Sequence, residues 1–247
     1  MNVTPADVLK SYKGLLKKDK KAGHLKKLEG IERTNLDGAK FEAVVYSILQ
    51  SLRISVEIGD DPVSGGTDFI CTVRDHKFAF EATTINTYAM ERQTGLQNDQ
   101  REISGGCYQC YQGMFLKLED KVKQLSRNEF PGIVCIGSFH NESRMIFRDV
   151  MADEYLDVFS MDVMANESLK SISAFILVGF GFDDYKIMGF LNPQPKYPFD
   201  IQLLPDINFR KITEKGIKER TGEGEWTNAK GGSMTSLFPN HPLEIVH

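Results

Sequence analysis

Helix-like and strand-like patterns of apolar residues alternate along this chain, and their order predicts a sheet covered by helices. The first strong pattern places apolar side chains at helical spacing between Phe41 and Leu52. Three strand-like segments follow it, at Ile54–Ile58, Phe69–Val73 and Lys77–Thr84. The last two segments are close enough in sequence to form a hairpin.

The second half of the chain continues this alternation. Apolar residues recur at helical spacing in Tyr108–Leu125, and Gly132–Phe139 is a strand-length run that is rich in Ile and Val. The segment Asn141–Phe159 favours a helix, whereas Ile172–Phe180 and Tyr185–Leu191 favour two more strands. We therefore expect an α/β fold with a mixed central β-sheet flanked by helices.

The 247 residues are enough for one large domain with extensions. Residues 1–36 are expected to form a basic helical N-terminal extension. A turn around Asn35–Gly38 is expected at its boundary with the next helix. Residues 37–192 contain most of the alternating patterns and are expected to form the α/β core. Five prolines follow Pro193, so residues 193–247 are expected to be a loop-rich C-terminal segment.

Charge is distributed unevenly along the chain, although the formal net charge is only −4. Between Lys10 and Lys27 there are eight lysines and one acidic residue, whereas residues 149–167 are acidic. A local basic segment can bind phosphate groups even on an acidic protein, so we expect nucleic acid to contact this region. The lysines expected to contact the phosphate backbone are Lys17, Lys18, Lys20 and Lys21. A solvated helix face would have the same composition, and this alternative stays open.

Targeting and redox features favour a cytoplasmic protein. No apolar run approaches the roughly 20 residues that a membrane-spanning helix needs, so no membrane partner is expected. The N-terminus lacks the apolar stretch of a secretory signal. Four cysteines in a chain of this length do not suggest a disulfide framework. Cys107 and Cys110 form a lone CxxC, which does not predict a zinc site because a second pair of ligands is missing.

Two carboxylates in the expected hairpin are the strongest candidates for chemistry. Asp68 precedes one strand, and Glu81 interrupts the apolar pattern of the other. A turn with an even number of residues would pair position 68 with position 83, which puts Asp68 on the same face of the sheet as Glu81 and Thr83. Neighbouring carboxylates in a partly buried place repel each other, and a divalent cation would relieve this repulsion. We therefore expect Asp68 and Glu81 to bind Mg²⁺ or Mn²⁺.

The segment from Phe41 to Phe139 resembles the PD-(D/E)xK nuclease superfamily, whose members have a restriction-endonuclease-like fold. The resemblance rests on a helix that carries Glu42, a strand, a glycine-rich loop that leads into Asp68, and a hairpin that reaches Glu81. It implies that Asp68 and Glu81 hold a catalytic metal ion and that Glu42 is a further metal ligand. It also implies hydrolysis of phosphodiester bonds in nucleic acid, with DNA favoured over RNA, in a restriction, anti-phage or repair setting. Many members are dimers, so the resemblance implies a homodimer as well.

The chain departs from the superfamily pattern at the position of its lysine. Thr83 stands where the motif has the lysine that orients the attacking water and offsets negative charge in the transition state. Some members carry this lysine on the following helix, where Lys121 is the preferred substitute because Lys121–Gln124 resembles the Lys-x-x-Gln found there. The other candidate lysines are Lys77, Lys117 and Lys123. Thr67 also replaces the proline of the motif, at a position that members keep loosely.

Each of these residues has a structural interpretation beside the functional one. Asp68 could cap the loop at a strand start, and Glu42 could be a favourable acid near a helix N-terminus. Glu81 could form a structural ion pair with Lys121 or Arg101. If no lysine reaches the carboxylates, we expect a catalytically degenerate module that binds nucleic acid or a partner protein. A third hypothesis is an interaction protein that self-associates through its basic and acidic helices.

Overall fold

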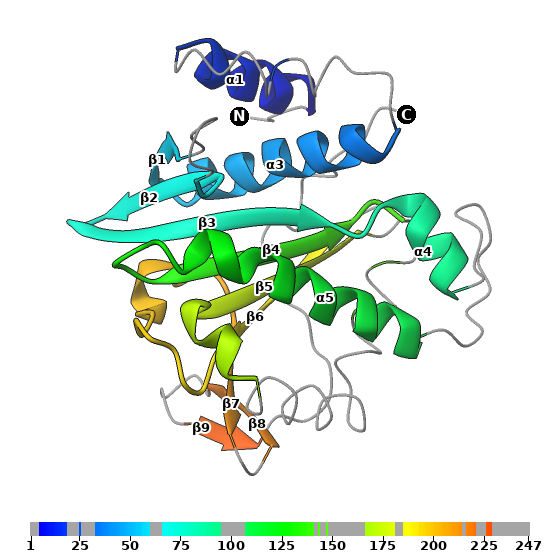
Figure 1. The fold of residues 1–247 in the computed structure, drawn as a ribbon. Helices are drawn as coiled ribbons and strands as arrows, with labels where there is room; N and C mark the ends of the chain where they lie inside the picture. The colour runs from blue at the N-terminus through cyan, green and yellow to red at the C-terminus, as the bar shows by residue number, and fades with distance from the viewer. Residues whose placement is uncertain are drawn as a thin grey trace.

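The computed structural model describes residues 5–18, 25, 33–59, 66–94, 107–140, 143, 147, 166–180, 185–213, 216–220 and 226–228 of the chain (Figure 1). Some sequence expectations concern residues outside these ranges: Lys20, Lys21, Arg101, the glycine-rich loop at 60–65 and most of Asn141–Phe159.

The described helices and strands alternate largely as the sequence predicts. The helices are α1 (Pro5–Lys18), α3 (Arg33–Ser51), α4 (Thr87–Thr94), α5 (Cys107–Leu125) and the 3₁₀ helices η1 (Glu167–Ser171) and η2 (Ile201–Leu203). The strands are β1 (Ser55–Ile58), β2 (Phe69–Val73), β3 (His76–Thr84), β4 (Gly132–Ser138), β5 (Ala174–Phe180), β6 (Tyr185–Leu191), β7 (Phe209–Thr213), β8 (Gly216–Arg220) and β9 (Trp226–Asn228). Within the described part of the chain, no helix is long and apolar enough to cross a lipid bilayer.

The described strands pair into a mixed sheet whose strand order, β1-β2-β3-β4-β5-β6-β7-β8-β9, is also their order along the sequence. The first three strands form an antiparallel meander. β3, β4 and β5 then run parallel to one another, and β6 is antiparallel to β5. β7 is parallel to β6, and β8 and β9 extend the sheet by antiparallel pairing.

Helices cover both faces of this sheet, and a hydrophobic core lies between the sheet and the helices on each face (Figure 1). On one face, Phe41 of α3 packs with alternate strand residues such as Phe78 and Phe80. On the other face, Leu118 of α5 packs with intervening strand residues such as Ala79. β3 contributes to both cores because successive strand side chains point to opposite faces. The predicted α/β fold, with a mixed central sheet flanked by helices, is confirmed.

The hairpin of β2 and β3 closes with the two-residue turn Arg74–Asp75. Both turn residues have positive φ, 48° and 68°, as in the type I′ turns that join antiparallel strands tightly. Phe69 consequently pairs with Phe80, and the same register places position 68 opposite Glu81. The predicted pairing of position 68 with Thr83 was therefore wrong by two residues. The predicted face was correct because strand side chains repeat every second residue.

The N-terminal part of the chain packs into the same core as the sheet. Tyr12 and Leu16 of α1 are fully buried together with residues of α3. α3 begins at Arg33, so the predicted turn at Asn35–Gly38 is wrong and the expected boundary between residues 36 and 37 falls inside this helix. Packing of α3 on the sheet thus outweighs the turn preference of Asn, Asp and Gly in its first two turns.

The segment after Pro193 contains strands as well as loops. Among its described residues, η2 and β7 bring Leu203 and Phe209 into the same hydrophobic core as the buried residues of α3, together with Phe199. β7 also continues the sheet through its short parallel pairing with β6. The described part of this segment therefore completes one end of the sheet.

Candidate active site

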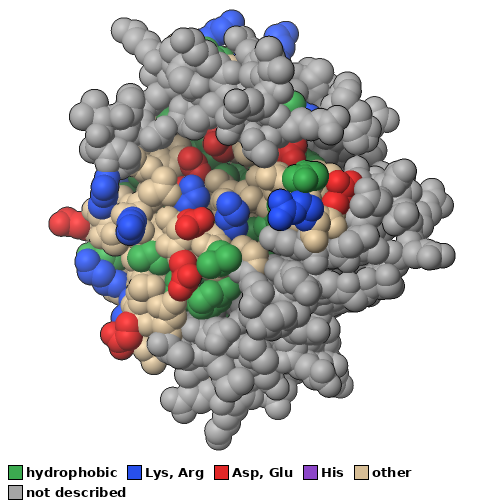
Figure 2. All heavy atoms as spheres, turned by 45° about the vertical axis from the view of Figure 1, so that its right-hand side comes forward, with side chains coloured by type: hydrophobic (Ala, Val, Ile, Leu, Met, Phe, Trp, Pro, Cys, Tyr) green, Lys and Arg blue, Asp and Glu red, His purple; other side chains and the backbone are tan. Residues whose placement is uncertain are grey.

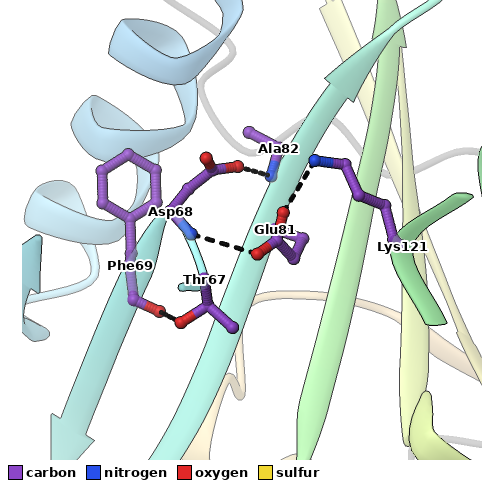
Figure 3. Close-up of polar contacts among 6 residues, drawn as sticks. All are labelled: Thr67, Asp68, Phe69, Glu81, Ala82 and Lys121. Carbon is purple, nitrogen blue, oxygen red and sulfur yellow. Dashed lines mark hydrogen bonds and ion pairs between the residues drawn. The ribbon is translucent and has the colours of Figure 1, made fainter. Parts of the chain in front are cut away.

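Asp68 and Glu81 contact each other where the chain enters β2 (Figure 3). The backbone N–H of Asp68 donates a hydrogen bond to Glu81 Oε1 at 3.1 Å. The backbone N–H of Ala82 donates to Asp68 Oδ2 at 2.7 Å. Glu81 is therefore held by the main chain of Asp68, and Asp68 is held by the main chain of the residue that follows Glu81.

The main chain around Asp68 is held by the end of β1. The N–H of Gly59 donates to the carbonyl oxygen of Asp68 at 3.1 Å. This contact needs a glycine, since a Cβ at position 59 would lie 2.7 Å from the carbonyl oxygen of the buried Thr67. The close approach of Gly59 therefore fixes the backbone that presents the Asp68 carboxylate.

Lys121 reaches the carboxylates from α5, on the side of Glu81 opposite Asp68 (Figure 3). Its Nζ donates to Glu81 Oε2 at 2.8 Å. The Lys121 side chain is 17% exposed and the Glu81 side chain 0%, so this ion pair is largely screened from water. The structure thus brings together the three residues to which the sequence assigned the catalytic roles: Asp68, Glu81 and Lys121.

The remaining candidate lysines do not share this position. Lys77 is exposed and lies four residues before Glu81 on β3, a separation of roughly 13 Å along an extended strand. Lys123 is exposed on α5, and no ion pair joins Lys117 to a described acid. Thr83 lies on β3, two residues beyond Glu81. Of the candidate lysines, the one that contacts Glu81 is therefore Lys121 of α5.

Glu42 lies on α3 and is 9% exposed. Its Oε2 accepts a hydrogen bond from the Tyr12 hydroxyl at 2.9 Å. The charge of Glu42 raises the pKa of Asp68, so the two acids are within electrostatic reach of each other. However, the described residues contain no group of three His, Cys, Asp or Glu side chains that could hold a metal ion together. A direct ligand role for Glu42 therefore stays a prediction.

Burial governs the ionisation of these groups. It raises the pKa of Asp68 well above its ordinary value, and the negative charges of Glu81 and Glu42 raise it further, against the opposing effect of Lys121. Burial also raises the pKa of Glu81, although Lys121 and the Asp68 N–H partly offset this. Burial lowers the pKa of Lys121, but the charges of Asp68 and Glu81 outweigh it, so the net pKa is raised. Lys121 therefore stays a cation at neutral pH.

Comparisons with known proteins give no independent assignment of this site. No protein-family model, no curated protein and no solved structure matches the chain. The chemistry that the site can perform is therefore inferred from the contacts of its own residues.

The donor set fits a hard divalent cation. Asp68 and Glu81 offer carboxylate oxygens, which are the ligands that Mg²⁺ and Mn²⁺ prefer. Mg²⁺ is commonly held by one or two carboxylates together with water and the phosphate of a substrate, so a third acid is not required. A cation beside these acids would also favour their charged forms, which burial disfavours.

The basic segment is described only in part. Lys17 and Lys18 are exposed in the last turn of α1, and Lys10 is exposed near its middle. Figure 2 shows basic side chains projecting at the top of the molecule, where Figure 1 places α1. The face turned toward the viewer in Figure 2 carries basic and acidic side chains side by side. The described lysines of α1 are therefore accessible for phosphate contacts.

Tyr12 is the residue near this site that the sequence did not indicate. Its spacing in α1 marks it as one of the apolar positions that face the core, and it is 1% exposed. Its hydroxyl partner, Glu42, lies 30 residues further along the chain. The residue type alone could have indicated a polar contact of Tyr12, because a buried tyrosine hydroxyl usually needs a polar partner.

Proposed function

We propose that this protein is a Mg²⁺- or Mn²⁺-dependent nuclease that hydrolyses phosphodiester bonds in nucleic acid. The observation that carries the proposal is the meeting of Asp68, Glu81 and Lys121, which come from the hairpin and from α5. Two carboxylates beside one ammonium are the groups that such a reaction needs from the protein. The preference for DNA over RNA and the restriction, anti-phage or repair setting come from the sequence resemblance alone.

The proposed roles follow from the charges of the three side chains. Asp68 and Glu81 would hold the metal ion, which polarises the phosphodiester and lowers the pKa of a water molecule when it is bound. Lys121 would offset the negative charge that develops on the phosphate in the transition state. A lysine with a raised pKa suits this electrostatic role, whereas a general base would need a lowered one.

The order of elements around the site also supports the proposal. The helix α3, the meander β1-β2-β3, the helices α4 and α5 and the parallel strand β4 follow one another in the chain. The first part of this order, a helix that carries Glu42 followed by a strand and a hairpin, is the part on which the resemblance to the PD-(D/E)xK superfamily rests. The restriction-endonuclease-like fold is therefore part of the proposal.

One observation favours a second function. A lysine does reach the carboxylates, so the condition stated above for a degenerate module is not met, but the ion pair of Lys121 with Glu81 gives Glu81 a structural role that requires no metal ion. On this view the protein is a catalytically degenerate module that binds nucleic acid or a partner protein. The two functions differ in metal affinity, because only the nuclease needs a carboxylate pair that binds Mn²⁺.

The deciding experiment compares the wild-type protein with Glu81→Ala. Cleavage of single-stranded and double-stranded DNA and RNA is measured in Mg²⁺ and in Mn²⁺, and Mn²⁺ binding is measured by titration calorimetry. We expect metal-dependent cleavage that Glu81→Ala abolishes. Glu57→Ala is the matched control, since Glu57 is exposed on β1. Wild-type protein that binds nucleic acid but neither binds Mn²⁺ nor cleaves any substrate would favour the degenerate module.

The role of Lys121 is tested by comparing two lysines of the same helix. Lys121→Met should reduce the cleavage rate by about 10²–10³-fold, as expected for the loss of a group that stabilises transition-state charge. Lys123→Met removes an exposed lysine of α5 and should leave the rate unchanged. Equal rates for both variants would exclude a direct role of Lys121 in the reaction.

A further inference from the structure

The buried hydrogen bond between Tyr12 and Glu42 links the N-terminal helix to the candidate site. The Tyr12 hydroxyl donates to Glu42 Oε2 at 2.9 Å, and the two side chains are 1% and 9% exposed. A carboxylate in such a place keeps one orientation only if its oxygens have fixed partners. The hydroxyl of Tyr12 is one of these partners, and it comes from a different helix.

The ring of Tyr12 is itself held by residues of the site's own elements. It lies 5.5 Å, between ring centroids, from Tyr46 on α3 and 6.3 Å from Phe69 on β2. Phe69 directly follows Asp68 in the chain and is fully buried. The hydroxyl of Tyr12 therefore cannot move away from Glu42 without displacing packed aromatic rings.

Glu42 in turn acts on the Asp68 carboxylate. Its hydrogen-bond partner Tyr12 packs on Phe69, the residue after Asp68, so the Glu42 carboxylate lies near the carboxylate pair, and its charge raises the pKa of Asp68. The position of the Glu42 carboxylate therefore sets part of the electrostatic field in which Asp68 lies. If the Glu42 carboxylate turned away from the site, the negative potential there would be weaker, and the site would attract a cation less strongly.

We propose that Tyr12 is a positioning residue, which holds Glu42 toward the candidate metal site and makes α1 a part of that site. This inference rests on the proposed function, because it assigns to Tyr12 an effect on metal binding. A hydrogen-bonding partner of this kind typically changes metal affinity by roughly 10- to 100-fold when it is lost. α1 would then have two roles, with its buried face supporting the site and its exposed lysines contacting phosphate.

The test is a double-mutant cycle read out by Mn²⁺ affinity. Tyr12→Phe removes only the hydroxyl, Glu42→Gln removes the charge of its partner, and the third variant combines the two. We expect Tyr12→Phe to weaken Mn²⁺ binding about tenfold or more, and to have no further effect once Glu42→Gln is present. Circular dichroism and thermal unfolding establish that each variant is folded. A merely structural role of Tyr12 would lower the melting temperature without changing the affinity of the folded protein for Mn²⁺.

Tyr46→Phe is the matched control, because Tyr46 is a neighbouring buried tyrosine on α3 and is 7% exposed. Its loss of a hydroxyl should leave Mn²⁺ affinity unchanged. Wild-type affinity in Tyr12→Phe, or an equal loss with and without Glu42→Gln, would overturn the positioning role while the proposed function stands. Wild-type protein that neither binds Mn²⁺ nor cleaves nucleic acid would overturn the proposed function and this inference together.

Discussion

At neutral pH the Asp68 carboxylate lowers the stability of the folded, metal-free protein. Its pKa is raised because the group is buried beside Glu81 and Glu42, so the folded protein holds the Asp68 proton more tightly than the unfolded chain does. Below the ordinary value of 3.8 the carboxyl is protonated in both states. Stability is therefore lost as the pH rises from that value through the raised pKa of the folded state.

Asp68→Asn should therefore stabilise the protein at neutral pH while it abolishes metal-dependent cleavage. The amide oxygen can still accept the hydrogen bond from the Ala82 N–H, so the loss of charge is the main change. We expect a gain of about 0.5–2 kcal/mol at pH 7.5 in chelator, which raises the melting temperature by about 2–4 °C for each kcal/mol. Circular dichroism melts at several pH values measure this difference, which should shrink as the pH falls toward 4.

Added Mn²⁺ provides the control for this comparison. It should raise the melting temperature of the wild-type protein, because a ligand that binds only the folded state stabilises that state. It should leave the melting temperature of Asp68→Asn unchanged. An Asn variant that is less stable than wild type at pH 7.5 would contradict the assigned electrostatic penalty.

At the scale of the elements, the contact between α3 and β4 determines where Glu42 lies. The ring of Phe41, the residue before Glu42, packs directly on Gly137 of β4. A Cβ at position 137 would lie 2.2 Å from the Phe41 ring, well inside the shortest distance that carbon atoms tolerate. Gly137 is therefore required for α3 to approach the sheet this closely.

Gly137→Ala should destabilise the protein by about 1–3 kcal/mol, because the added methyl group overpacks the core between α3 and β4. It should also weaken Mn²⁺ binding, since α3 carries Glu42. Gly14→Ala is the control, because Gly14 is exposed in α1 and a Cβ there meets no atom within 4 Å. This second change should stabilise the protein by about 0.5–1 kcal/mol. Urea denaturation measures the free energy of unfolding of both variants. A change of the same sign in both would contradict the packing argument.

The elements themselves could be predicted well where periodicity is strong. The helix α5 and the strands β4, β5 and β6 appear in the structure within a few residues of their expected bounds, and α3 ends at Ser51, one residue before its expected end. The start of α3 was missed because Asn35, Asp37 and Gly38 favour turns in isolation. In the structure Asp37 accepts a hydrogen bond from the Thr87 N–H of α4 at 3.3 Å, a tertiary contact that local sequence does not reveal.

The candidate site could be predicted as a set of residues but not as a geometry. The face shared by Asp68 and Glu81 follows from strand alternation, whereas their register depends on the turn Arg74–Asp75. This turn has positive φ at both residues but contains no glycine, so the usual sequence signal for a two-residue turn is absent. The contact of Lys121 with Glu81 depends on how α5 packs on the sheet, which no local pattern specifies.

At the scale of the whole molecule, electrostatic attraction to nucleic acid depends on local patches of charge. The formal net charge of −4 opposes a polyanion at long range. The exposed lysines of α1 are therefore expected to contribute through direct contacts with phosphate groups, which release counterions.

Lys17→Ala combined with Lys18→Ala should weaken nucleic-acid binding similarly for all sequences. The slope of log affinity against log salt concentration should become shallower by about 1 for each phosphate contact that is lost. Fluorescence anisotropy with a labelled duplex at several salt concentrations measures both effects. Lys211→Ala is the control, since Lys211 is exposed on β7 at the other end of the sheet. A loss of affinity as large for Lys211→Ala would show that α1 has no special role.

The agreement between strand order in the sheet and strand order in the chain has a consequence for biosynthesis. During synthesis α3 and the meander β1-β2-β3 leave the ribosome before the later strands, and each later strand adds to an edge that is already present. α5 precedes β4, so Asp68, Glu81 and Lys121 all emerge before the parallel strands β4 and β5. The three residues of the candidate site are thus synthesised before the strands that complete the sheet.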